Sequence, residues 1–115
     1  MSRWMVTTPL PDALAADGLA TIDLLRSDVP THDKTEPAFA FIYSVAERSL
    51  AYHFREPLAE LGVGLVTRKT LDVALDLALK GIRRGIRSVL GGMDDAQLRG
   101  VADAIEYRLY PDPHG

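Results

Sequence analysis

Apolar positions recur at helical spacing in four segments of the chain. The first segment, Pro9–Arg26, has Thr8 as a candidate N-cap and Pro9 at the first helical position, where proline is tolerated. Its apolar stripe consists of Leu14, Gly18, Ile22 and Leu25. Glycine weakens a helix interior, so the pattern predicts either one helix or two short ones that meet near Gly18.

The second segment begins between residues 33 and 37, because Asp33 and Glu36 have capping-box spacing while Pro37 disfavours helical angles at Glu36. Its core-facing stripe consists of Phe39, Ile42, Ala46, Leu50 and His53. Pro57 is expected to kink or stop the helix near Arg55. A short final turn should then end at the glycines 62 and 64.

The third segment has the most regular pattern. Thr67 is its candidate N-cap, and Gly91 and Gly92 are expected to supply a left-handed residue at its end. Its apolar stripe consists of Leu71, Leu75, Leu79, Ile82, Ile86 and Val89. The fourth segment should begin with a capping box of Asp94 and Gln97 and end before Pro111.

Four helices with short connections predict an all-α, small four-helix bundle-like domain that spans residues 1–115, with flexible ends over 1–8 and 111–115. The alternative is a small α+β domain with a short N-terminal strand. In that fold, residues 4–7 would pair with residues 63–66, because periodicity alone does not separate short apolar runs from buried strands.

Composition narrows the classes of protein to which the chain can belong. It has 115 residues and no cysteine, which excludes disulfides, thiolate metal sites and cysteine nucleophiles. The longest apolar runs, such as Ala38–Tyr43, are about six residues, so no membrane span or signal segment is expected, and the expected compartment is the cytoplasm. With a net charge of −3 and a pI near 5.5, nucleic-acid binding is not expected.

A second stripe on the third segment consists of residues with small side chains. These residues are Ala74, Ala78, Gly81, Gly85 and Ser88. Two glycines inside a helix cost about 0.8–1 kcal/mol each relative to alanine, so close approach of another backbone should offset them. The first expectation is packing on the second helix of the same chain; the next is a second copy, and the third is a flat small molecule.

Basic residues gather at the end of the same segment, where Lys80, Arg83, Arg84 and Arg87 occupy the last two turns before the glycines. Cations near a helix C-terminus complement the macrodipole, which makes a solvated basic face the first interpretation. An anion site, extended by Arg68 and Lys69, is the functional alternative.

His53 lies on the apolar stripe of the second segment, with Ser49 four residues before it. A packed histidine with one satisfied ring nitrogen is the first interpretation; a cofactor or ligand contact or a general base is the alternative. The three histidines lack metal-ligand spacing, and no nucleophile–base–orienter set is recognisable. The sequence therefore assigns no catalytic residue and no metal ligand, and it favours a protein that is not an enzyme.

The preferred hypothesis from sequence is a non-catalytic, all-helical interaction or regulatory module. It is expected to form a homodimer through the small-residue stripe. The alternative is a small-ligand or cofactor-binding protein with a cleft between its second and third helices, in which His53 faces the ligand and Arg84 or Arg87 holds an acidic group. Anion or nucleic-acid binding through the basic end of the third helix is a weaker alternative, and an enzyme built around His53 ranks last. No particular cofactor is indicated.

Overall fold

The chain is helical throughout the part that the structure, a computed structural model, describes, which is residues 7–62 and 64–111. The elements are α1 (Asp12–Arg26), α2 (Thr31–Leu50), the π-helical turn η1 (Ala51–Arg55), α3 (Glu56–Glu60), α4 (Leu65–Gly91) and α5 (Asp95–Arg108). Within these described residues there is no strand, because Leu65 and Val66 begin α4. The all-α prediction is confirmed; Trp4–Val6, in the strand of the alternative fold, lie outside the described residues.

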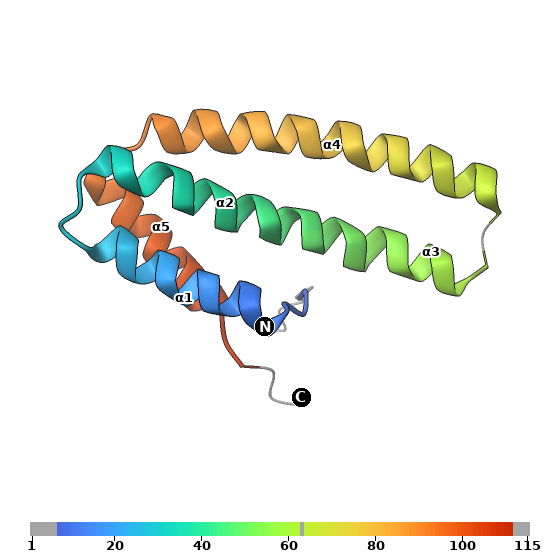
Figure 1. The fold of residues 1–115 in the computed structure, drawn as a ribbon, viewed down its shortest axis with the longest axis horizontal. Coiled ribbons are helices and arrows are strands. Elements are labelled where there is room, and N and C mark those ends of the chain that lie inside the picture. The colour runs from blue at the N-terminus through green and yellow to red at the C-terminus, as the bar shows by residue number, and fades with distance from the viewer. Residues whose placement is uncertain (1–6, 63, 112–115) are drawn as a thin grey trace, which may run out of the picture.

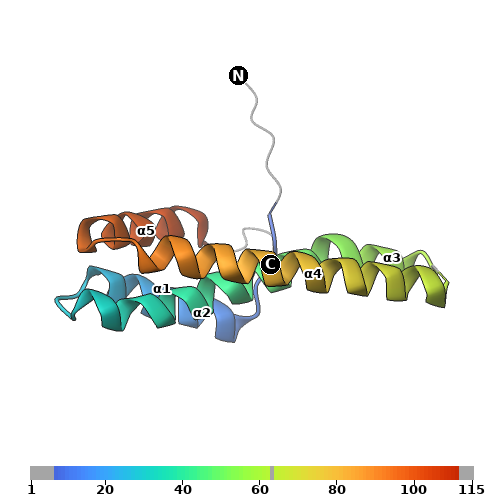
Figure 2. The same ribbon diagram turned by 90° about the horizontal axis from the view of Figure 1, so that it is seen from above.

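The two ends of the molecule differ in how many helices they contain. α2, η1 and α3 follow one another without a break, and we call this continuous helical segment the rod. It runs beside α4 (Figure 1). At one end α1 packs on both α2 and α5, which gives a four-helix body. Seen from above, α3 and the first half of α4 project beyond α1 and α5 (Figure 2). We call this projecting part, residues 47–61 and 65–78, the arm.

The starts of α1, α2 and α4 differ from the sequence prediction. α4 begins at Leu65, so the expected cap Thr67 lies inside it. α1 begins after Pro11, whose ψ of 148° is extended, so neither Thr8 nor Pro9 starts it. α2 begins at Thr31, and Pro37 lies inside it. A proline there removes only the hydrogen bond to the carbonyl of Asp33, which is exposed and can bond to water instead.

The rod changes its helical geometry just before Pro57. The N–H of Glu56 bonds to the carbonyl of Ala51, five residues back, which is the π-helical pattern. This widening lets the chain continue through a proline that has no N–H for the carbonyl of His53. The expected kink near Arg55 is therefore a π-helical turn, and a short helix follows it as predicted.

Of the glycines expected to end α3 and α4, only some have the predicted left-handed conformation. Gly62 has a φ of 68°, so the end of α3 uses the left-handed conformation that favours glycine. Gly92, at the end of α4, has a φ of −92°, so the expected left-handed residue is absent there. The capping box of α5 is confirmed, with Asp94 accepting from the N–H of Gln97 at 2.8 Å and the Gln97 side chain accepting in return at 2.9 Å.

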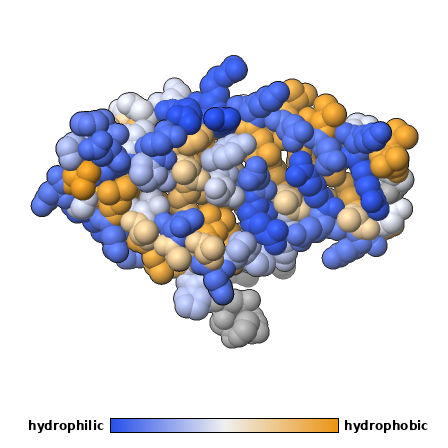
Figure 3. Space-filling view, in the orientation of Figure 1, coloured by the Kyte–Doolittle hydropathy of each residue, from blue (hydrophilic) through white to orange (hydrophobic). Residues whose placement is uncertain are grey.

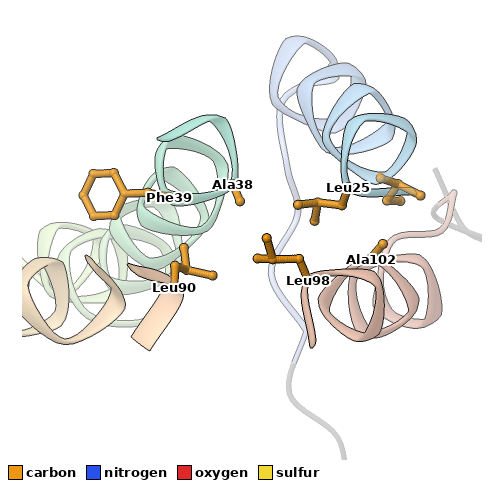
Figure 4. Close-up of a cluster of buried hydrophobic side chains, with 7 residues drawn as sticks. Leu25, Ala38, Phe39, Leu90, Leu98 and Ala102 are labelled. Carbon is orange, nitrogen blue, oxygen red and sulfur yellow. The ribbon is translucent and has the colours of Figure 1, made fainter. Parts of the chain in front are cut away.

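The hydrophobic core lies in the four-helix body. Leu25 of α1 and Leu98 of α5 point toward one another, and both are fully buried (Figure 4). Contributions from the other helices complete this cluster: Ile22, Ala38, Phe39, Leu90 and Ala102. The core therefore ties α1 to α5 and both of them to the rod and the end of α4.

Gly18 is required by close packing. α1 is one continuous helix, so the alternative of two short helices is wrong. A Cβ built on Gly18 would come within 2.7 Å of Leu109 and 2.8 Å of the Phe41 ring. Without a side chain at this position, the ring can lie directly against the α1 backbone, which offsets the helix-propensity penalty of glycine.

A buried lysine joins three helices at one corner of the body. Lys34 is fully buried, and its Nζ donates to the carbonyls of Leu25 and Ser27 at 3.1 and 2.7 Å and to Asp95 Oδ1 at 2.6 Å. Arg99 donates to the carbonyl of Ser27 and to Asp95 as well. Cations thus bind the free carbonyls at the end of α1, where the helix dipole is negative.

These ion pairs make stability depend on pH. The Lys34 ammonium and the Arg99 guanidinium hold the pKa of Asp95 below its ordinary value, and Arg26 lowers the pKa of Glu106 in the same way. Both pKa values are lower in the folded chain, so their stabilising effect is complete above a pH of about 4.5 and is lost as the pH falls through the folded values. We expect the free energy of unfolding from urea titrations to be level between about pH 7 and 5 and to decrease below about 4.

The matched variant for this measurement is Asp95→Asn combined with Glu106→Gln. It removes both titrating groups and should give a shallower decrease on acidification than the wild-type chain. An equal decrease in both proteins would show that other carboxylates set the acid response.

Candidate interaction surface

The small-residue stripe of α4 is open to solvent. Ala74, Ala78, Gly81, Gly85 and Ser88 are all exposed. A Cβ built on Gly81 or Gly85 would meet nothing within 4 Å outside the helix itself. The expectation that this stripe packs on the second helix of the same chain is therefore wrong. α2 packs on the leucine side of α4, where Leu75 and Leu79 are buried, because larger apolar side chains bury more surface.

The stripe is the centre of a wide uncharged surface. At 3.6 residues per turn, a sector of about 140° around it holds no charged residue along the whole of α4. The charged residues of α4 fall in the other part of the circumference. We call this uncharged sector the open face of α4; it consists of Thr67, Thr70, Leu71, Ala74, Leu77, Ala78, Gly81, Ile82, Gly85, Ser88 and Val89. Leu71 and Ile82 at its edge are half-buried, and the rest are exposed.

Charged side chains lie at the boundary between α4 and the rod, away from the open face. Figure 3 shows hydrophilic side chains between α4 and the rod, with hydrophobic ones at the end of the arm and over part of the upper edge. Arg55 of η1 lies 3.1 Å from Asp72 and 3.4 Å from Asp76 of α4. These ion pairs join the two helices of the arm without using the open face.

An apolar groove adjoins the C-terminal half of the open face. Its volume is about 440 Å³, and its lining residues, from α2, α4 and α5 and the residue between the last two, are Ile42, Ile82, Gly85, Ile86, Val89, Leu90, Met93 and Val101. Every lining residue is uncharged. The lining includes neither His53 nor Arg84 nor Arg87, so the groove is not the cleft in which these three residues were expected to hold a ligand.

One of the four basic residues near the end of α4 is paired with an acidic residue of α2. Arg87 donates to Glu36 at 2.9 and 3.1 Å, and its guanidinium lies 4.1 Å from the centre of the Phe39 ring. Lys80, Arg83 and Arg84 are exposed. Arg68 and Lys69 lie eleven to twelve residues from Lys80 on one helix, about 18 Å away, so they do not extend the basic end.

His53 belongs to a small polar cluster on the rod. Its Nε2 lies 3.0 Å from Thr8 Oγ1, which also donates to Ser49 Oγ at 3.1 Å. The Tyr52 ring meets the imidazole edge to face, with centroids 5.0 Å apart. Ser49 and His53 thus meet through Thr8, a residue that the sequence suggested only as a helix cap. The cluster fixes the start of the described chain to the arm.

The described residues offer no site for a metal ion, since nowhere among them do three or more His, Asp or Glu residues gather suitably. None of the helices in this part of the chain combines the length and apolar character needed to span a bilayer. Comparisons with models of known protein families, with curated proteins and with solved structures find no match to this chain.

Proposed function

We propose that this protein is a non-catalytic helical interaction module that forms a homodimer through the open face of α4. The observation that carries the proposal is the position of Gly81 and Gly85. Both lie in the interior of a 27-residue helix, and no contact among the described residues requires either of them to be glycine. Their cost of about 0.8–1 kcal/mol each is offset if another backbone approaches this face closely.

A second copy fits this surface for an electrostatic reason. α4 carries six basic and two acidic residues, all of them outside the open face, so two α4 helices that met through their cationic sides would repel one another. The open face is uncharged and can lie against itself. A two-fold interface needs only one self-complementary patch, which this face provides.

Leucine substitutions on the stripe should abolish the dimer. We expect the wild-type chain to give twice its 12.6 kDa mass by light scattering, and Gly81→Leu and Gly85→Leu to give the monomer mass, because the added side chains hold the two backbones apart. Gly100→Leu is the matched control, since Gly100 is an exposed glycine inside α5 that also has open space around it. A wild-type monomer, or a dimer unaffected by Gly81→Leu, would contradict the proposal.

Alanine substitutions separate the fold from association. Gly81→Ala should raise the free energy of unfolding of the monomer by about 1 kcal/mol through helix propensity, while it weakens dimer formation. Gly100→Ala should give the same stabilisation with no change in association. An equal effect of the two variants on association would remove Gly81 from the interface.

The apolar groove favours one alternative, which is binding of a small apolar molecule. Its volume of about 440 Å³ falls within the range of about 300–1,000 Å³ that small-molecule pockets occupy. A mild native mass spectrum of freshly purified protein distinguishes the two functions. Twice the chain mass supports the dimer, whereas the mass of one chain plus a retained molecule supports the ligand-binding alternative.

A further inference from the structure

The arm has an apolar surface that the described part of the chain leaves exposed. It contains six of the eleven large hydrophobic residues that are exposed in the described part of the chain, whereas Leu75 is the one buried residue of the arm. Exposure is greatest at its tip, where Leu61 is 77%, Leu65 67% and Val66 80% exposed. Two helices that bury so little apolar surface against each other resemble one half of a four-helix bundle.

The apolar groove lies at the opposite end of α4 from this tip. Gly85 follows Val66 by nineteen residues, a distance of about 28 Å along the helix axis. The open face of α4 runs between them without a charged residue. One copy therefore presents an apolar projection and an apolar depression, separated by a surface that permits close approach.

We propose that the arm tip of each copy fills the apolar groove of the other, with the two α4 helices antiparallel and Ala74 at the two-fold axis. Ala74 is midway between Val66 and Ile82, so an antiparallel pair centred there brings Val66 of one copy level with Ile82 of the second copy. Leu65, the first residue of α4, is then level with Arg83 of that copy, so the tip reaches the near end of the groove at Ile82 and Gly85. This arrangement rests on the proposed function and specifies how the dimer is built.

The charges of α4 favour the antiparallel direction. The first half of the helix balances Arg68 and Lys69 against Asp72 and Asp76, whereas the second half has four cations from Lys80 to Arg87. A parallel pair would place the two cationic halves side by side, which costs free energy. The antiparallel pair places each cationic half beside a half of zero net charge.

The available area is sufficient for a stable dimer. Two helices over fifteen residues present a surface of about 20 by 22 Å, and the remaining length of the open face adds about 150 Å². This gives about 600 Å² per copy, or about 1,200 Å² in total, at the lower limit of stable interfaces. The stripe of α4 alone would not reach this value, so the arm is needed.

Cross-linking through single cysteines tests the arrangement, because the chain has no cysteine of its own. Ala74→Cys should form a disulfide-linked dimer under mild oxidation, since at the axis the two residues come within the roughly 4–7 Å between Cα atoms that a disulfide requires. Ser88→Cys is the matched control on the same face. Its two copies would lie about 42 Å apart and should not cross-link.

The possible results separate this inference from the proposed function. Dimer mass with a cross-link at Ala74→Cys but not at Ser88→Cys supports both. Dimer mass with a cross-link at Ser88→Cys, or at neither position, overturns the arm-in-groove arrangement and leaves the homodimer in place. Monomer mass overturns both.

Charge at the arm tip gives an independent measurement. Leu61→Asp should weaken the dimer at least about tenfold in sedimentation equilibrium, because Leu61 lies at the rod side of the tip and its carboxylate variant would be placed against an apolar groove. Leu19→Asp, at an exposed position on α1, should leave the dissociation constant unchanged. Equal dissociation constants for Leu61→Asp and the wild-type chain would place the tip outside the interface.

Discussion

Replacing Lys34 with methionine should lower the free energy of unfolding by about 3 kcal/mol. Lys34 is fully buried, and its ammonium donates to two carbonyls at the end of α1 and to Asp95. Methionine fills a similar volume but donates no hydrogen bond, so the carbonyl of Leu25 loses its donor and Asp95 loses one of its two cationic partners. Urea denaturation followed by circular dichroism measures the difference.

The control for this measurement is Lys80→Met. Lys80 is an exposed residue of α4, and its replacement should change the free energy of unfolding by no more than about 0.5 kcal/mol. A loss below about 1 kcal/mol for Lys34→Met would show that apolar packing at this corner compensates for the missing hydrogen bonds.

Replacing Leu98 with alanine should cost between about 2 and 5 kcal/mol. Leu98 is fully buried at the centre of the core, where it faces Leu25, and its removal leaves a cavity that the surrounding helices fill only in part (Figure 4). Thermal and urea unfolding should both show the loss. Leu19→Ala, at an exposed position of α1, is the matched control and should change stability by no more than about 0.5 kcal/mol.

The fold could be predicted from the sequence where one physical effect dominates. The apolar periodicity of the third segment predicted a helix and the spacing of Asp94 and Gln97 predicted a capping box. The structure has both, although Val89 of the apolar stripe is exposed. The predicted starts of α1 and α2 were wrong because a proline can either precede the first turn of a helix or be tolerated inside the helix. Pro11 excludes the residues before it from α1, whereas Pro37 is accommodated within α2.

The candidate surface could be predicted only in part. The small-residue stripe is visible in the sequence, but spacing alone does not tell which face of a helix is covered by other parts of the same chain.

The burial of Lys34 was not predicted, because a lysine is ordinarily expected on the surface. One signal was present: Lys34 precedes the buried Ala38 by four residues and therefore lies on the same side of α2.

The polar contact between Thr8 and His53 could not be foreseen. Forty-five residues separate the two, and no periodic pattern connects them. Contacts of this kind depend on how complete helices are placed relative to one another, which local sequence rules do not determine.

The uneven burial along the rod has a consequence for how the molecule becomes ordered. The body holds its helices together through a shared core, whereas the arm has Leu75 and a few ion pairs at its surface. Segments with few buried contacts open at a lower free energy than the rest of a protein. Any partner that covers the arm therefore also consolidates it, so recognition and local folding are thermodynamically linked in this half of the chain.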